Sequence, residues 1–139
     1  MRVRLVAAAI GLALAALAVG ACGDGDGGGG DAASTSIEVT ASEFKFEPDS
    51  WTVPASEEFT IAFENGGSVE HEWAVIKLGR DIDTEAEFAE DKVLFEVEAI
   101  PAGESVTESL TVEDAGIYQV ICAIETHFDA GMEGTLTVE

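Results

Sequence analysis

The chain has 139 residues and a mass of 14.5 kDa, which is room for one domain and excludes a large multidomain enzyme. Its 28 acidic and six basic residues give a formal net charge of −22. Because such an acidic chain lacks the basic surface that displaces counterions from phosphates, we exclude nucleic-acid binding. Two cysteines are too few for the disulfide scaffold of a small secreted domain.

The first 21 residues have the pattern of a secretory signal. A short basic segment, Met1 to Arg4, is followed by uncharged residues from Leu5 to Val19. This apolar run is shorter than the roughly 20 residues that span a bilayer and suits the core of a signal peptide. The ending Val19-Gly20-Ala21-Cys22 resembles the lipobox of bacterial lipoproteins, in which the cysteine is lipidated and becomes the mature N-terminus. We therefore predict a lipoprotein signal peptide over 1–21, with a plain cleaved signal as the alternative.

Residues 22–36 are rich in Gly and Asp and include the run Gly27 to Gly30. Such a composition cannot bury a core, so the segment is predicted to be a flexible tether. Lipidated Cys22 would then hold the domain at the outer face of the cell membrane, on the periplasmic or cell-surface side. Without the signal, 28 acidic residues face four basic ones, a net charge of −24. This charge would attract cationic partners, although solubility or adaptation to high salt explains it equally well.

From Ile37 onward the apolar residues recur at every second position, which is typical of strands with one buried face. Ile37, Val39 and Ala41 alternate with polar residues, and a later run ends at the turn sequence Asn65-Gly66-Gly67. The first alternation continues at Phe44 and Phe46, and further strands are predicted around Trp51 and Val53, 59–63, 73–76, 93–97, 106–112, 117–121 and 136–138.

One short helix is predicted over 84–90, because Thr84 and Glu87 match a capping box and good helix formers follow. Seven to eight short strands in about 100 residues indicate an all-β fold, a β-sandwich over residues 37–139. The aromatic residues expected in its core are Phe44, Phe46, Trp51, Phe63 and Trp73.

Side chains that bind soft metal ions are scarce after residue 22, and their positions are informative. Cys122, His127 and Met132 lie within eleven residues, where a strand ends and a loop leads to the last strand. His71 begins an earlier strand after a Gly-rich turn, and a sandwich can bring it to the same end. Each residue alone has an ordinary structural explanation, but together two His, one Cys and a weakly held Met form the ligand set of an electron-transfer copper site. Zinc gains little from a thioether, and carboxylates serve harder cations.

The pattern Tyr118-x3-Cys122-x4-His127-x4-Met132-x-Gly134-Thr135, with His71-Glu72-Trp73 upstream, resembles the cupredoxins, the small blue copper proteins related to plastocyanin, azurin and auracyanin. The resemblance implies a Greek-key β-sandwich, one copper ion that alternates between Cu(I) and Cu(II), and one-electron transfer between larger redox partners. His71, Cys122 and His127 would be the strong ligands, and Met132 the axial one.

Two positions depart from the family pattern. Glu72 stands where the family often has Asn, and Glu125-Thr126 replaces the common Pro-Gly before the second histidine. Both changes concern the hydrogen bonds around the ligands, and hence the reduction potential, and neither changes the number of ligands.

With two histidines in the whole chain, no second metal site can be built from imidazoles once the copper site is formed, and no histidine is left for a catalytic triad. We therefore expect a monomeric electron carrier at the membrane rather than an enzyme. An apolar rim of Phe128, Ala130 and Gly131 beside His127 is the expected docking patch, and the acidic residues would steer a redox partner with a basic face, such as a cytochrome. The alternatives are a copper-handling lipoprotein, a scavenger or chaperone that passes on the ion, and a metal-free adhesion or sensor sandwich.

Overall fold

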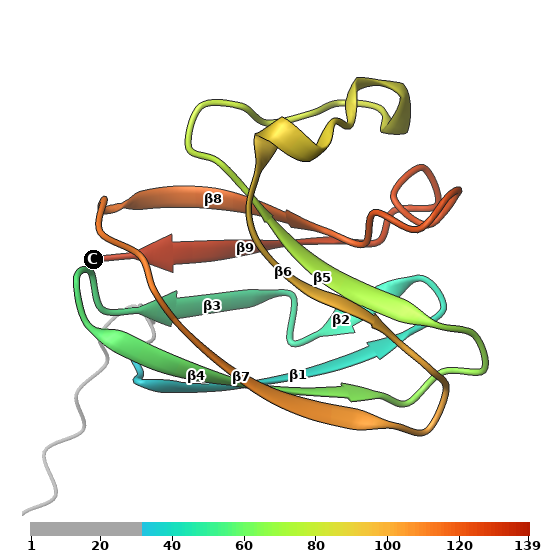
Figure 1. Ribbon diagram of the computed structural model, residues 1–139, viewed down its shortest axis with the longest axis horizontal. Helices are drawn as coiled ribbons and strands as arrows, with labels where there is room; N and C mark the ends of the chain where they lie inside the picture. Colours follow the sequence, from blue (N-terminus) through green and yellow to red (C-terminus); the bar gives the residue numbers. More distant parts are fainter. Residues whose placement is uncertain (1–31) are drawn as a thin grey trace, which may run out of the picture.

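The computed structural model describes residues 32–139, which form two β-sheets that face each other (Figure 1). The predicted signal peptide (1–21), the lipidation site Cys22 and most of the predicted tether lie outside the described residues. Within 32–139, no helix has the length and apolar character needed to cross a bilayer. The last tether residues are held by the sandwich, because Ser34 donates a backbone hydrogen bond to Thr52 (2.9 Å) and Thr35 accepts one from Thr60 (3.0 Å).

The strands divide into sheets of four and five. The first sheet has the order β2-β1-β4-β7, with β1 (Ser36–Ser42), β2 (Lys45–Glu47), β4 (Glu58–Asn65) and β7 (Ser105–Thr111). The second has the order β3-β9-β8-β5-β6, with β3 (Ser50–Val53), β5 (His71–Ile76), β6 (Val93–Ile100), β8 (Gly116–Ile121) and β9 (Glu133–Val138). The pairs β1/β4 and β3/β9 are parallel and the others antiparallel. The predicted all-β sandwich is confirmed, with nine strands in the described part rather than seven or eight.

The core between the sheets follows from the period-two pattern. Along β4, Phe59, Ile61 and Phe63 are fully buried, while the residues between them face outward or are partly covered. Burial of each such side chain stabilises the fold by about 1.5–3 kcal/mol. The expected core positions of Phe46, Trp51, Phe63 and Trp73 are confirmed.

The core assignment of Phe44 is wrong, because 42% of its side chain is exposed. Phe44 lies in the turn between β1 and β2, where the strand alternation is interrupted. It therefore belongs to the surface at one end of the sandwich.

The segment 77–92, which we call the strap, covers the outer face of the second sheet. Trp73 and Val75 of β5 point into the main core, whereas Ala74 and Ile76 face the other way and pack with Ile82 of the strap. The helix predicted over 84–90 is wrong: the strap has only two 3-10 turns, η1 (Glu85–Glu87) and η2 (Glu90–Lys92).

The physical reason for the missing helix lies in the packing of the strap. Phe88, directly after the first turn, is extended (φ −62°, ψ 136°) and packs onto the same outer cluster as Ile82. The capping-box pattern is only half used, since the Thr84 side chain makes no capping hydrogen bond and the Glu87 carboxylate accepts the N–H of Asp83 (2.7 Å). Burial of the two apolar side chains thus outweighs the weak local helix preference.

Candidate metal centre

The loop between β8 and β9 folds back on itself and brings its ends together. Cys122, the first residue after β8, donates its backbone N–H to the carbonyl of Met132 (3.2 Å). Met132 in turn donates to the carbonyl of His127 (3.1 Å). We call residues 122–132 the ligand loop; these bonds place the backbones of its three expected ligands next to one another.

His71, Cys122 and His127 converge as the sequence predicts. One potential ligand atom from each lies within 4.8 Å of the other two, and the Cys122 sulfur is 3.3 Å from Nδ1 of His127. The centroids of the two imidazole rings are 5.0 Å apart. All three side chains are buried, with His71 and Cys122 fully covered. A cluster of one thiol and two imidazoles from β5 and the ligand loop is therefore enclosed at one end of the sandwich.

The donor set fits a bound metal ion. Both ring nitrogens of His71 are buried and have no hydrogen-bond partner within the described residues. A buried imidazole without partners is unfavourable, and coordination of a metal by one ring nitrogen would satisfy it. Thiolate and imidazole together suit copper and zinc.

Met132 is fully buried, and its backbone bonds both other ligands of the loop. Met132 belongs to the main core cluster, which also contains Cys122. The axial role of its thioether stays a prediction.

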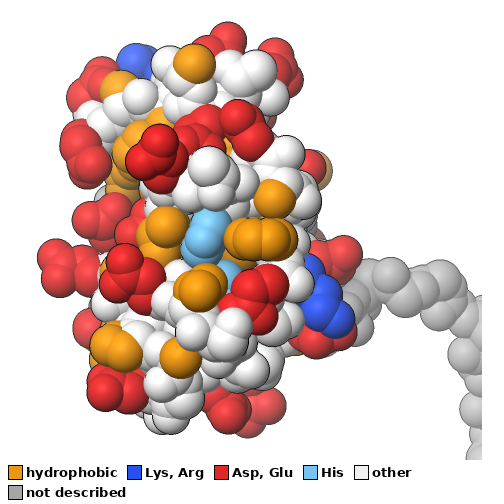
Figure 2. Space-filling model, turned by 90° about the vertical axis from the view of Figure 1, so that its right-hand side faces the viewer, with side chains coloured by type: hydrophobic (Ala, Val, Ile, Leu, Met, Phe, Trp, Pro, Cys, Tyr) orange, Lys and Arg blue, Asp and Glu red, His pale blue; other side chains and the backbone are white. Residues whose placement is uncertain are grey.

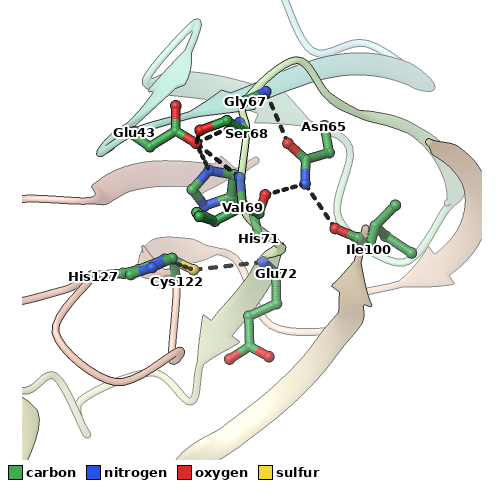
Figure 3. Close-up of polar contacts among 10 residues, drawn as sticks. All are labelled: Glu43, Asn65, Gly67, Ser68, Val69, His71, Glu72, Ile100, Cys122 and His127. Carbon is green, nitrogen blue, oxygen red and sulfur yellow. Dashed lines mark hydrogen bonds and ion pairs between the residues drawn. The ribbon is translucent and has the colours of Figure 1, made fainter. Parts of the chain in front are cut away.

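Asn65, which the sequence analysis treated only as part of a turn, organises the segment that leads to His71 (Figure 3). Its buried side chain donates to the carbonyls of Val69 and Ile100, both at 2.7 Å, and accepts the N–H of Gly67 at 2.9 Å. Three bonds from one fully buried amide fix the turn, so β5 begins with His71 in a defined place. A lone Asn before Gly-Gly predicts a turn, and nothing in the pattern shows that it is buried.

The environment of Cys122 combines burial with backbone donors. Burial raises the pKa of the Cys122 thiol to about 11, and the N–H groups of Glu72 and Ile124 partly oppose this effect. The N–H of Glu72 lies 3.5 Å from the sulfur (Figure 3). In the metal-free protein the sulfur is thus held as a neutral thiol, and a bound cation would favour the thiolate.

The side chain of Glu72 takes no part in the cluster and extends away from His71 and Cys122 (Figure 3). Burial raises the pKa of its carboxyl to about 7, and the charge of Glu96 contributes further. Glu72 therefore acts on the cysteine in two ways: its backbone N–H lowers the pKa of the Cys122 thiol, and the charge of its carboxylate raises it.

Glu43, in the turn after β1, is a second residue near the cluster that the sequence analysis did not identify. Its carboxylate accepts hydrogen bonds from the N–H and hydroxyl of Ser68 and from the N–H of Val69. These donors, the Ser68 backbone first, lower the pKa of Glu43 to about 2. The same oxygen lies 3.6 Å from Nε2 of His71.

The surface over the cluster is apolar and differs from the expected rim. Figure 2 shows histidine at the centre of this end, surrounded by hydrophobic side chains and then by acidic ones. His127 is 7% exposed, and the exposed ring of Phe44 packs edge-on against it with 5.0 Å between centroids. Ala130 and Gly131 are exposed as expected, but Phe128 is only 8% exposed because it packs with the outer cluster beneath the strap.

Comparisons with known proteins agree with this arrangement. No curated protein matches the chain. Among solved structures, auracyanin from the photosynthetic bacterium Roseiflexus castenholzii has a TM-score of 0.66 at 22% identity, covering 77% of this chain and 98% of its own. Auracyanin A, a "blue" copper protein from Chloroflexus aurantiacus, has a TM-score of 0.63 at 26% identity, covering 75% and 98%. An azurin from Methylomonas sp. strain J has a TM-score of 0.64 at 26% identity, covering 77% and 99%.

The sequence model described as the cupredoxin-like domain matches residues 5–138. That range includes both sheets, His71 and the whole ligand loop. The chain therefore belongs to the family of cupredoxin-like domains.

Proposed function

We propose that this protein binds one copper ion through His71, Cys122, His127 and Met132 and carries single electrons between larger redox proteins. The observation that carries the proposal is the convergence of three buried ligand atoms within 4.8 Å of one another. Membership of the cupredoxin family and the similarity to auracyanin A, itself a blue copper protein, support the choice of copper.

Bound copper would supply the one-electron chemistry by alternating between Cu(I) and Cu(II). The protein supplies a ligand set that both oxidation states accept, since the thiolate suits Cu(I) and the imidazoles suit both. It also supplies rigidity: Asn65 fixes the approach to His71, and the ligand loop is closed by backbone bonds between Cys122 and Met132. A site that changes little between the two states needs little reorganisation when an electron arrives or leaves.

The route for electrons would pass through the edge of His127, which is the ligand with an exposed fraction. Phe44 beside it supplies an apolar contact surface, together with the exposed Ala130 and Gly131 of the ligand loop. The acidic surroundings would speed encounters with a basic partner such as a cytochrome. Electron-transfer contacts are small and short-lived, so a tight complex is not expected.

The cellular setting belongs to the same proposal. The signal pattern over 1–21 and the lipobox cysteine Cys22 support a domain anchored by lipid at the outer face of the cell membrane. No catalytic step is assigned to the protein, because both histidines are used as ligands and the family's copper sites serve transfer.

The experiment is a visible and electron paramagnetic resonance spectrum of the copper-loaded protein. We expect an intense thiolate-to-copper absorption band that disappears in Cys122→Ala. Val120→Ala, a truncation of a fully buried residue of β8, the strand that leads to Cys122, is the matched control and should keep the band. A colourless wild-type protein would contradict the proposal, and release of copper upon reduction would favour a scavenger or chaperone instead.

A further inference from the structure

Among the described residues, Glu43 is the one carboxylate that lies within 4 Å of a ring nitrogen of the ligand cluster. One of its oxygens lies 3.6 Å from Nε2 of His71, and a third of the side chain is exposed. The hydrogen bonds from Ser68 and Val69 fix this oxygen in place, so its approach to the imidazole is not that of a free surface side chain.

The enclosure of Nε2 shows which edge of the His71 ring faces the protein. A Cβ atom added to Gly67 would lie 2.9 Å from Nε2 and 2.7 Å from the Glu43 oxygen. Nε2 therefore lies between the Gly67 backbone and the Glu43 carboxylate. Any side chain at position 67 would collide with both groups. Nδ1, the other ring nitrogen, is left as the atom that can bind a metal ion.

We propose that Glu43 is a positioning residue for the metal centre, whose carboxylate accepts a hydrogen bond from Nε2–H of His71 and holds Nδ1 toward the cluster. This inference rests on the proposed function. A closing movement of about 0.5 Å brings the pair to ordinary hydrogen-bond distance.

Two consequences follow for a bound metal ion. A carboxylate on the remote nitrogen fixes the tautomer and the orientation of a ligating imidazole and makes it a stronger donor. Its negative charge, only one ring away from the metal, also favours the more highly charged oxidation state. Glu43 should therefore strengthen metal binding in general and binding of Cu(II) over Cu(I) in particular.

The test is Glu43→Gln, which keeps an oxygen to accept from Ser68 and Val69 but removes the charge. Loss of an outer partner of a ligating histidine typically lowers metal affinity 10–100-fold, and we expect a fall in this range for Zn(II), which needs no redox chemistry. The ratio of Cu(II) to Cu(I) affinity should fall about tenfold, which raises the reduction potential by about 59 mV. Glu58→Gln, at the opposite end of β4 from Asn65, makes the same change in net charge and is the control.

A measurement on the metal-free protein separates this inference from the copper assignment. In nitrogen-15 NMR spectra, neutral His71 should carry its proton on Nε2 in the wild type, and Glu43→Ala should shift the population toward the Nδ1–H tautomer. A wild-type Nδ1–H tautomer would overturn the proposal, as would equal zinc affinities of Glu43→Gln and Glu58→Gln. Failure of the copper spectrum alone would overturn the proposed function and leave these two results to decide the role of Glu43.

Discussion

The carboxylate of Glu85 in the strap accepts the backbone N–H of Thr126 in the ligand loop at 2.7 Å. In return the N–H of Glu85 donates to the carboxylate of Asp129 at 3.0 Å. The two bonds join the strap to the ligand loop on both sides of His127. One of them acts at a strained backbone position, because Thr126 has φ +74°, a conformation that favours glycine.

Glu85→Ala should therefore loosen the ligand loop. Loss of a hydrogen bond to a charged acceptor typically costs about 1.5–3 kcal/mol, and we expect about 1 kcal/mol here because this contact is exposed to solvent. Hydrogen exchange should become faster at Thr126 and His127 in the metal-free protein. Glu90→Ala, in the same strap and without a side-chain hydrogen bond among the described residues, is the control. Unchanged exchange in Glu85→Ala would show that the ligand loop holds its shape alone.

The exposed ring of Phe44 leads to a prediction about electron transfer. Phe44→Glu should slow electron self-exchange between copper-loaded molecules at least tenfold, because it places a charge in the apolar contact surface beside His127. The folding stability should change little, since 42% of the side chain is exposed. Self-exchange can be measured from NMR line widths in mixtures of reduced and oxidised protein.

Ile117→Glu is the matched control for that experiment. Ile117 is 67% exposed and lies at the start of β8, whereas Cys122 follows the end of that strand. It adds the same charge away from the ligand end. Equal slowing in both variants would point to net charge rather than to a docking surface.

Met132 gives the test of the axial ligand. Met132→Gln should keep the thiolate-to-copper band but lower the reduction potential, because a harder donor favours Cu(II). The potential is measured by voltammetry and the ligand set by the visible spectrum. Met132→Leu, which keeps the apolar volume without a donor atom, should shift the potential in the opposite direction. Identical potentials in wild type, Gln and Leu variants would remove Met132 from the ligand set.

The sandwich and the ligand cluster could be predicted because their signals are local. Strand alternation marks the buried face, and the spacing of Cys122, His127 and Met132 places them on one loop. His71 was predicted to join them, and it does, because β5 pairs with β8 and starts where β8 ends.

The residues that the sequence did not reveal act through contacts far along the chain. Glu43 meets Ser68, and Glu85 meets Thr126, across separations of 25 and 41 residues. In an acidic chain such glutamates are indistinguishable from solvated ones. The burial of two phenylalanines was predicted wrongly for a similar reason: Phe44 was expected in the core and Phe128 at the surface. The burial of loop residues depends on what packs over them, and the strap packs over Phe128.

Glu72 carries the prediction about pH. Its carboxyl has a pKa of about 7 in the folded protein against an ordinary value of 4.5, chiefly because it is half-buried and then because Glu96 lies near. Between these values the folded state binds more protons than the unfolded state, so this group makes the protein less stable as pH rises from 4.5 to 7 and adds no further change above that.

Glu72→Gln should remove this penalty. The variant and the wild type should be equally stable below pH 4.5, and the variant should be more stable above pH 7 by about 2 kcal/mol, a value reduced from the full linkage energy because the group is partly solvated. Urea unfolding of the metal-free protein at pH 5 and pH 8 measures the difference, with Glu58→Gln as the control for net charge. Glu96→Gln should reproduce part of the effect, since it removes the like charge that raises the pKa of Glu72 most while leaving Glu72 half-buried. A gain in stability from Glu72→Gln that is the same at both pH values would mean that the carboxyl titrates alike in the folded and unfolded chains.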